Sequence, residues 1–250
     1  MTAQTNGSNA HQVGRLRYCA RAITALLCAA ILVASARTAQ AGINVWTSDG
    51  PPGGGGSILA VVIDPNECRT VYAGTANGGV FKSIDSGRTW SAVNVGLTHP
   101  ALVLSLAIDP TTSSTLYAGT RSGVFKSADG GGTWTAATAG PENVYALAVD
   151  PNAPTTLYAG NGSFQTGGVF KSTADAPGWS ASLTGTDVDA LAISPVNAGT
   201  LYAGTLQQGV FKSTDAGGTW QSTGLSVPVV SLVVDPVTSA TIYGASPSRS

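Results

Sequence analysis

The stretch TLYAGTLQQGVFKSTDAGGTW, residues 200–220, decides the fold of this chain. Two apolar runs rich in β-forming residues flank a short polar loop, and a turn built from Ser, Asp, Gly, Thr and Trp follows. The same stretch occurs at residues 70–90 and 115–134, and a degenerate copy occupies residues 156–180. A repeat of this kind indicates a solenoid, a propeller or an array.

A second pattern precedes each of these stretches and extends the repeat to a fifth copy. An apolar run closed by Asp-Pro or Ser-Pro is followed by a short turn and by a run that contains a tyrosine. These tyrosines are Tyr72, Tyr117, Tyr158, Tyr202 and Tyr243. A complete repeat has four short β-forming runs, and four strands in about 40–45 residues is the size of a propeller blade. We predict an all-β protein, a β-propeller of about five four-stranded blades.

The first 41 residues form a segment of their own. Arginines within residues 15–21 precede an uncharged apolar run over residues 22–36, and the small-x-small sequence Ala-Gln-Ala follows at residues 39–41. This is the pattern of a secretory signal peptide, and the apolar run is shorter than the about 20 residues of a membrane span. We expect a signal peptide over residues 1–41, a secreted or periplasmic location and no stable membrane insertion after cleavage. An uncleaved membrane anchor is the alternative.

Residues 42–250 carry the repeats. Blades are expected near residues 57–100, 101–141, 142–186, 187–227 and 228–250, with residues 42–50 added to the last of them. The fifth copy stops after its second run, and a two-stranded blade would leave an unpaired edge. Two arrangements follow: a closed ring in which the N-terminal segment completes the last blade, or an incomplete, open ring.

Composition excludes several kinds of partner. The 250 residues carry a net charge of −1 and only 10% are charged, against roughly 25% in a typical soluble domain. No basic stripe is present, so we expect no nucleic-acid partner. Without the signal peptide the chain keeps one cysteine, Cys68, and one histidine, His99. We therefore expect no metal, no other cofactor and no internal disulfide.

An eight-residue turn with the spacing Ser-x-Asp-x-Gly-x-Thr-Trp occurs three times. Its members are Ser83, Asp85, Gly87, Thr89 and Trp90; Ser127, Asp129, Gly131, Thr133 and Trp134; and Ser213, Asp215, Gly217, Thr219 and Trp220. The turn resembles the Asp box of BNR and sialidase-type β-propellers, which are similar to WD40 and YVTN repeats. The chain looks most like the group of sortilin-type receptors, xyloglucanase-like glycosidases and photosystem II stability factors.

The resemblance implies that these turns are structural and lie on the rim away from the active face. A carboxylate can accept backbone N–H bonds within such a turn, and glycine supplies a positive φ. In the third repeat Asp175 and Pro177 break the spacing, so this turn is expected to be the loosest.

A sialidase would need an arginine triad, a Tyr–Glu pair and an aspartate on one face. Outside the signal peptide the arginines are Arg69, Arg88, Arg121 and Arg249. Arg69 and Arg88 are expected on the rim away from the active face, and Arg249 lies in the polar C-terminal tail. The arginine triad of a sialidase therefore cannot be assembled.

A xyloglucanase-like enzyme is the second comparison that the resemblance suggests. Its repeats carry a catalytic Asp just after a Tyr-Ala-x-Thr segment, where this chain has Ala76 and Asn77. Those enzymes also form their cleft from two propeller domains, and this chain has residues for one. Glycoside hydrolysis needs two carboxylates around the scissile bond, and the only close pair in the predicted loops is Asp187 with Asp189.

The loops in which the repeats differ form the predicted binding surface, because shared positions build the blades and variable loops usually carry function. Loops between the second and third strands share one face with the loops between blades. The candidate binding residues on this face are Asn77, His99, Arg121, Glu142, Phe164, Gln165, Asp187, Asp189 and Gln207. The lysines of the four VFKS runs are expected on a solvated strand edge instead.

These observations predict a non-enzymatic propeller that binds a protein or a glycan, or scaffolds an assembly, through its variable-loop face. The alternative is a degenerate or partial glycoside hydrolase of the xyloglucanase-like type, with Asp187 and Asp189 as its carboxylate pair.

Overall fold

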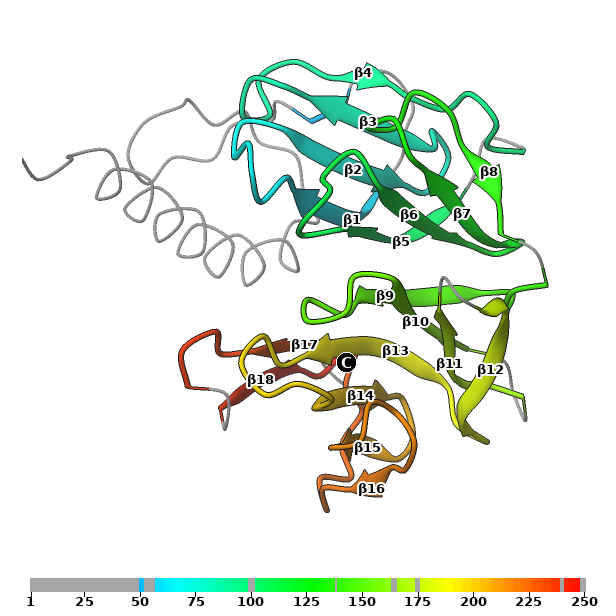
Figure 1. Cartoon of the computed structure of the whole chain (residues 1–250), viewed down its shortest axis with the longest axis vertical. Helices are drawn as coiled ribbons and strands as arrows, with labels where there is room; N and C mark the ends of the chain where they lie inside the picture. The colour runs from blue at the N-terminus through cyan, green and yellow to red at the C-terminus, as the bar shows by residue number, and fades with distance from the viewer. Residues whose placement is uncertain are drawn as a thin grey trace, which may run out of the picture.

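The computed structural model describes residues 50–51, 57–98, 102–137, 139–162, 166–173, 176–238 and 241–247. The predicted signal peptide and residues 42–49 lie outside these ranges. Every regular element in the described ranges is a β-strand, and the strands form five antiparallel sheets in chain order (Figure 1). No helix in these ranges is long and apolar enough to cross a membrane. The prediction of an all-β propeller is confirmed, and the described sheets are not closed, which fits an incomplete ring.

We number the five sheets as blades 1 to 5. Blade 1 contains β1 (Ile58–Ile63), β2 (Val71–Thr75), β3 (Val80–Ser83) and β4 (Ser91–Ala92), and blade 2 contains β5 (Val103–Ile108), β6 (Leu116–Thr120), β7 (Gly123–Ser127) and β8 (Thr135–Ala136). Blade 3 contains β9 (Val144–Val149), β10 (Thr156–Asn161), β11 (Gly168–Thr173) and β12 (Ala176–Thr184), and blade 4 contains β13 (Val188–Ile193), β14 (Leu201–Thr205), β15 (Gly209–Ser213) and β16 (Gln221–Ser222). Blade 5 consists, in the described residues, of β17 (Ser231–Val234) and β18 (Ile242–Ala245).

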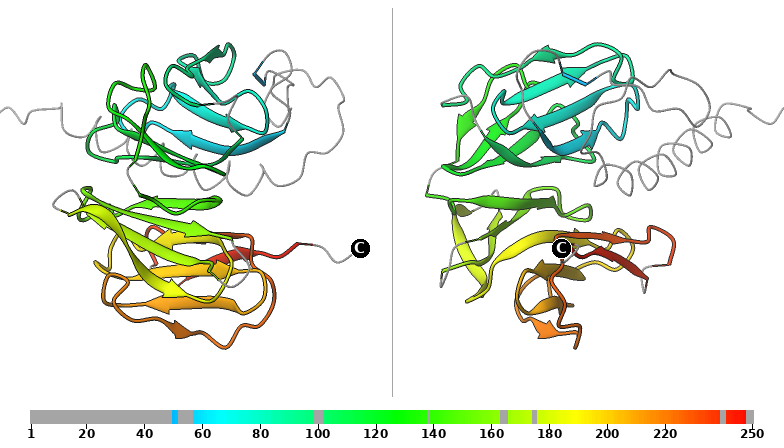
Figure 2. Two further views of the ribbon diagram at one scale, coloured as in Figure 1. Left: turned by 90° about the vertical axis from the view of Figure 1, so that its right-hand side faces the viewer. Right: turned by 180° about the vertical axis from the view of Figure 1, so that it is seen from behind.

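The first strand of each blade lies toward the middle of the molecule (Figures 1 and 2). Successive first strands β1, β5, β9, β13 and β17 contact one another in that order. The glycine of each Tyr-Ala-Gly run permits this approach, because an ideal Cβ on Gly119 would lie 2.7 Å from Val144 Cγ1 in the next blade. The same relation joins Gly160 to Val188 at 2.6 Å.

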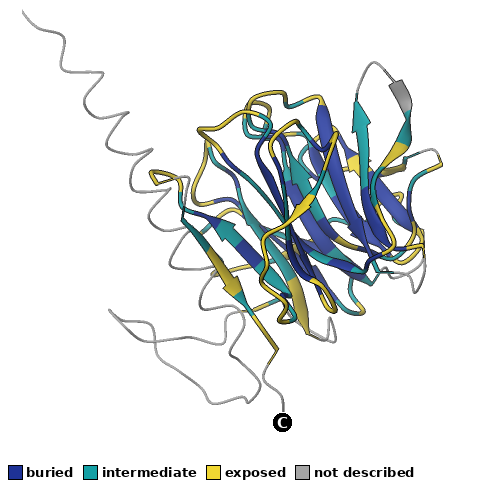
Figure 3. Cartoon of the chain, turned by 90° about the horizontal axis from the view of Figure 1, so that it is seen from below, coloured by how far each residue is buried: buried dark blue, intermediate teal, exposed yellow. Residues whose placement is uncertain are grey.

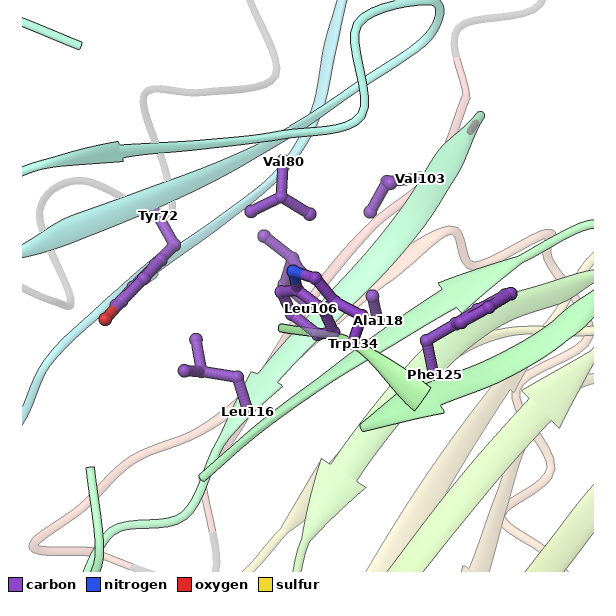
Figure 4. Packing of buried hydrophobic residues seen from close by; sticks show 8 residues of the cluster. All are labelled: Tyr72, Val80, Val103, Leu106, Leu116, Ala118, Phe125 and Trp134. Carbon is purple, nitrogen blue, oxygen red and sulfur yellow. The ribbon is translucent and has the colours of Figure 1, made fainter. Parts of the chain in front are cut away.

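Apolar side chains fill the space between neighbouring blades. Between blades 1 and 2 the cluster contains Tyr72, Val80, Val103, Leu106, Leu116, Ala118, Phe125 and Trp134 (Figure 4). Side chains alternate along a strand, so Tyr72 faces blade 2 while Val71 and Ala73 face the other way. Figure 3 shows the buried strands in the middle of the blades and the exposed loops at their ends. The hydrophobic effect therefore acts mainly between blades.

The lysines of the VFKS runs join this contact between blades. Tyr72 pairs with Lys82 across β2 and β3, and Lys82 Nζ lies 5.2 Å from the centre of the Tyr72 ring. Lys82 Nζ also donates to the carbonyl oxygen of Gly130 in blade 2 at 3.1 Å, and Lys171 makes the equivalent 2.9 Å bond to Ala216. The expectation of a merely solvated strand edge is wrong for these two lysines, because a carbonyl of the next blade lies within reach.

The three Ser-x-Asp-x-Gly-x-Thr-Trp turns share one hydrogen-bond pattern. In blade 2 the Ser127 hydroxyl donates to Asp129 Oδ1 at 2.8 Å and accepts from the Gly131 N–H at 2.9 Å. Asp129 also accepts from the N–H and the hydroxyl of Thr133, each at 2.8 Å. The same bonds recur in blades 1 and 4. Each turn is thus closed by its own side chains.

The aspartate of the Asp-Pro pairs organises the turn after the first strand. Asp64 Oδ1 accepts hydrogen bonds from the N–H groups of Asn66 and Glu67 at 2.8 and 3.2 Å. Asp109 and Asp235 make the same kind of bonds in blades 2 and 5. Proline cannot donate to the ladder and ends the strand, but the carboxylate shapes the turn that follows.

Blade 3 differs from the other complete blades in its fourth strand. β12 has nine residues, whereas β4, β8 and β16 have two residues each. It pairs with β11 along a ladder that runs from the pair Gly168 and Thr184 to the pair Thr173 and Ala176. Asp175, in the turn that was expected to be the loosest, lies outside the described residues, and the strand after that turn is the longest described one.

Within the described residues the ring is open between blades 5 and 1. In the described residues no strand of blade 5 pairs with a strand of blade 1. β18 is an edge strand on which Tyr243 and Gly244 are exposed. Of the two arrangements that the sequence allowed, the described part forms the open one.

The expectation that Cys68 forms no disulfide is wrong, because Cys68 is disulfide-bonded in the structure. That expectation assumed that the other two cysteines, Cys19 and Cys28, leave with the signal peptide. Both lie outside the described residues.

Candidate functional site

The loops between second and third strands are shaped by the threonine that ends the second strand. Thr75 Oγ1 donates to the carbonyl oxygen of Gly79 at 3.0 Å and accepts from the Gly78 N–H at 2.9 Å. The same pair of bonds recurs in blade 4. Because the hydroxyl closes each loop from inside, the side chains at the tips face solvent, and Asn77 and Gln207 are exposed.

The loops between blades lie beside these loops. The Asn143 N–H donates to the carbonyl oxygen of Arg121 in blade 2 at 2.9 Å, and the Asn143 carbonyl accepts from the Gly162 N–H in blade 3 at 3.3 Å. In blade 1 the Ala76 N–H donates to the Ser57 carbonyl at 2.9 Å. The two sets of loops therefore form one surface, which we call the loop face.

The candidate residues on the loop face differ in exposure. Those that are exposed are Asn77, Arg121, Glu142 and Gln207. Asp187 and Asp189 are half-buried where blade 3 leads into blade 4. The bond from Asn143 places the segments of Arg121 and Glu142 side by side. The remaining candidates, His99, Phe164 and Gln165, lie outside the described residues.

Asp189 lies at a break in the ladder between β13 and β14. The pairing steps from Val188 to Ala190, which leaves Asp189 without a partner on β14. The equivalent residues in blades 1 to 3 are Leu59, Leu104 and Tyr145. A bulge changes the direction of its side chain, and bulges are over-represented next to active sites. Only in blade 4, among the described complete blades, does a carboxylate occupy this position.

Burial raises the pKa of Asp189 above its ordinary value of 3.8, and the charge of Asp187 adds to the shift. Asp189 Oδ2 is buried and has no hydrogen-bond partner within the described part of the chain. Thr186 Oγ1 is buried without such a partner as well. Buried polar atoms are usually satisfied by protein, water or a ligand. A carboxyl group with a raised pKa beside a second carboxylate is suited to donate a proton.

The Ser-x-Asp-x-Gly-x-Thr-Trp turns lie at the opposite end of the blades. The Ser86 N–H donates to the carbonyl oxygen of Arg69 at 2.9 Å, in the turn between β1 and β2. Arg69 and Arg88 therefore lie away from the loop face. Hydrogen bonds from the backbone and the hydroxyl of Thr133 lower the pKa of Asp129 to about 2. A carboxylate held in this way suits a structural role rather than proton transfer.

Two features of the loop face escape the sequence patterns. One is the buried hydroxyl of Thr186. The other is Tyr145, which reads as part of an apolar strand but is 38% exposed and packs beside Gly162, where an ideal Cβ would lie 2.8 Å from the ring. One signal for Tyr145 was present in the sequence. The residue that follows the first valine of each innermost strand is Leu104 in blade 2, Tyr145 in blade 3 and Asp189 in blade 4.

Comparison with known proteins gives partial matches. No protein-family profile matches the chain. A xyloglucanase of Hypocrea jecorina (strain QM6a) is 37% identical over 81 residues, covering 26% of this chain and 10% of that protein. A GH74 enzyme of Niastella koreensis superposes with a TM-score of 0.62 at 21% identity, over 74% of this chain and 34% of that one. An ancestral GH74 enzyme gives a TM-score of 0.63 at 24% identity, over 81% and 28%.

The structural likeness also extends beyond these enzymes. A chain of a nidogen/laminin complex superposes with a TM-score of 0.61 at 12% identity, over 77% of this chain and 73% of that one. At such identities the solved structures support the propeller fold alone, and function does not follow from fold.

The comparisons correct the expectation of a non-enzymatic protein. That expectation is wrong, because the xyloglucanase and the GH74 enzymes point to a glycoside hydrolase-type relative. The chain spans 10% of the xyloglucanase and 34% and 28% of the two GH74 chains.

Proposed function

We propose that this chain is a glycoside hydrolase of the xyloglucanase-like type that acts on a β-linked glucan, such as xyloglucan, at its loop face. The observation that carries the proposal is the 37% identity to a xyloglucanase over 81 residues. The fold shared with two GH74 enzymes agrees with this class. Ala76 and Asn77 stand where the xyloglucanase-like pattern carries an aspartate, so the proposal assigns the acid to Asp189.

The proposed reaction uses the two carboxyl groups of the β12–β13 connection. Asp189 donates its proton to the glycosidic oxygen as the bond to the anomeric carbon breaks. Water adds to that carbon, and Asp187 accepts the proton that the water loses. Burial favours the protonated form of Asp189 because it disfavours the charged form. The buried Thr186 hydroxyl is a further hydrogen-bonding group beside this pair.

The exposed side chains of the loop face form the proposed sugar-binding surface. The ring of Tyr145 can stack on a pyranose, since aromatic rings combine apolar area with defined geometry. Asn77, Arg121 and Gln207 supply hydrogen-bonding groups for sugar hydroxyls. Glu142 extends the same surface.

We also propose that the Ser-x-Asp-x-Gly-x-Thr-Trp turns are Asp boxes of the BNR type. The repeated bonds around Asp85, Asp129 and Asp215 support this assignment. The signal-peptide pattern of residues 1–41 supports export, and a polysaccharide substrate outside the cytoplasm agrees with it.

Two measurements test the proposed function. Purified chain is incubated with tamarind xyloglucan, and new reducing ends are counted with starch as the α-linked control. Retention on a xyloglucan gel reports binding separately. We expect release of reducing ends from xyloglucan only, and Asp189→Asn should abolish release while retention persists.

The matched control is Glu67→Gln, which neutralises an exposed carboxylate in the turn between β1 and β2, on the opposite face. It should leave both readouts unchanged. No release from any β-glucan would reject the hydrolase, and retention that survives loss of Tyr145 and Arg121 together would reject the binding surface.

A further inference from the structure

Neighbouring blades meet through the same two faces at successive junctions. Between blades 1 and 2, Tyr72 packs in one cluster with Leu116 and Trp134 (Figure 4). Between blades 3 and 4, Tyr158 and Leu201 belong to the equivalent cluster. Each blade therefore offers a tyrosine face to the blade that follows it and receives the tyrosine face of the blade before it.

A polar contact accompanies the apolar one. The Tyr72 hydroxyl donates to the Gly130 carbonyl at 3.1 Å, and the Tyr158 hydroxyl donates to the Ala216 carbonyl at 2.9 Å. Both accepting residues have a positive φ, 68° for Gly130 and 56° for Ala216. Ser86 occupies the same turn position in blade 1 with a φ of 65°, so blade 1 presents the same carbonyl.

Blade 1 exposes the face that the following blades bury. We call Ile58, Val71, Ser86 and Gly87 the head face. Ile58 is 47% exposed, whereas its counterpart Val103 is 0% exposed. Val71 and Gly87 are half-buried, while the leucines that replace Val71 in blades 2 to 4 and the glycines that replace Gly87 in blades 2 and 4 are buried.

Blade 5 exposes the complementary face. We call Ser231, Val233 and Tyr243 the tail face; Val233 pairs with Tyr243 across β17 and β18. Tyr243 is 53% exposed, against 1% for Tyr72.

We propose that the tail face of one copy docks on the head face of a second copy, so that the chain assembles head to tail. Tyr243 packs on the Ser86–Gly87 turn of the next copy and its hydroxyl donates to the Ser86 carbonyl. Ile58 of that copy packs against Ser231 and Val233. The Tyr243 contact repeats the tyrosine contact that already joins blades within the chain, which is why a second copy fits. It is heterologous, so it leaves a free head and a free tail unless a ring of copies closes.

Sedimentation velocity of the full chain over a range of concentrations tests the proposal. Wild type should form species larger than a dimer as its concentration rises. Ile58→Asp removes the head and Tyr243→Asp removes the tail, and each should weaken self-association by about tenfold or more, as expected for a central aromatic or aliphatic contact. Val237→Asp is the matched control, because Val237 is 86% exposed in the β17–β18 turn and outside the tail face.

Mixing the two variants gives the decisive result. The Ile58→Asp copy keeps its tail and the Tyr243→Asp copy keeps its head, so the mixture should form a 1:1 dimer and nothing larger. Ile58→Ser and Tyr243→Ser replace any aspartate variant whose melting curve differs from wild type. A wild type that stays monomeric, or a mixture that stays monomeric while wild type associates, would overturn the proposal.

Discussion

The hydroxyl of Tyr72 donates a hydrogen bond to the carbonyl oxygen of Gly130, 58 residues further along the chain, at 3.1 Å. Lys82 Nζ donates to the same carbonyl at 3.1 Å and lies over the Tyr72 ring. Tyr158 repeats the arrangement with Ala216, again 58 residues away. Two donors from one blade thus converge on one acceptor in the Ser-x-Asp-x-Gly-x-Thr-Trp turn of the next, and this turn serves the junction as well as its own hairpin.

Tyr72→Phe should destabilise the protein, because it deletes one of these two donors while keeping the buried ring. A net loss of about 0.5–1.5 kcal/mol is expected for one such hydrogen bond, read from urea unfolding. Tyr117→Phe is the matched control, since Tyr117 makes no such bond among the described residues. Equal losses in the two variants would contradict a specific role for the Tyr72–Gly130 bond.

The Ser-x-Asp-x-Gly-x-Thr-Trp turns should make stability depend on acid pH. Bonds from Thr133 lower the pKa of Asp129 from 3.8 to about 2, and bonds from Thr219 do the same for Asp215. A lowered pKa in the folded state means that the contribution is complete above pH 3.8 and is lost as the pH falls toward 2. The melting temperature should therefore drop across this window.

Thr133→Val separates this effect from a general loss of stability. It removes the hydroxyl bond to the Asp129 carboxylate, so it should lower the melting temperature at pH 7 and flatten the drop between pH 4 and 2. Thr135→Val removes a hydroxyl bond to the Lys126 carbonyl, which does not titrate, and should leave the shape of the pH profile intact. A profile unchanged by Thr133→Val would contradict the assignment.

The sequence predicts the blades well because their signals are local. Each Tyr-Ala-Gly-Thr run and each Ser-x-Asp-x-Gly-x-Thr-Trp turn contains, within a few residues, the side chains that close its own loop. Contacts between blades are not predicted in this way, because they join residues that lie far apart in the sequence. The role of Lys82 depends on a carbonyl 48 residues away, and no local pattern separates it from a lysine on a solvated edge.

The candidate site was partly predictable for the same reason. Variation between repeats singled out Asp187 and Asp189, but the break in the ladder at Asp189 appears only when β13 is paired with β14. Tyr145 stands in an apolar run of the sequence, and its exposure depends on the same kind of break in the ladder between β9 and β10. The Cys68 disulfide was missed because the prediction removed both possible partners with the signal peptide.

Gly119→Ala should destabilise the junction between blades 2 and 3. The new Cβ would lie 2.7 Å from Val144 Cγ1 and 2.8 Å from the Val144 carbonyl oxygen, and the backbone atom cannot rotate away. Overpacking of this kind costs about 1–3 kcal/mol, measurable by urea unfolding. Gly244→Ala in blade 5 is the control, because Gly244 lies one residue after the tyrosine, where blades 1 to 4 carry alanine. The nearest atom to the new Cβ is a Leu232 side-chain carbon at 3.4 Å, so this substitution should be neutral. A Gly244→Ala loss as large as that of Gly119→Ala would show that crowding by the next blade is not the cause.

Asp189→Asn should stabilise the fold while it abolishes hydrolysis. Burial and, secondarily, the charge of Asp187 raise the pKa of Asp189, so the charged form is disfavoured in the folded state. Because the pKa of Asp189 is raised in the folded state, ionisation of Asp189 lowers the stability of the fold at pH values above that pKa. This loss of stability is absent below the unfolded pKa of 3.8. The melting temperature of Asp189→Asn should therefore exceed that of wild type at pH 7, and the difference should shrink as the pH falls toward 3.8. Asp187→Asn removes only the second cause and should give a smaller gain. A melting temperature lowered equally at pH 7 and pH 4 would mean that Asp189 holds the structure together, and would remove the reason for placing the acid there.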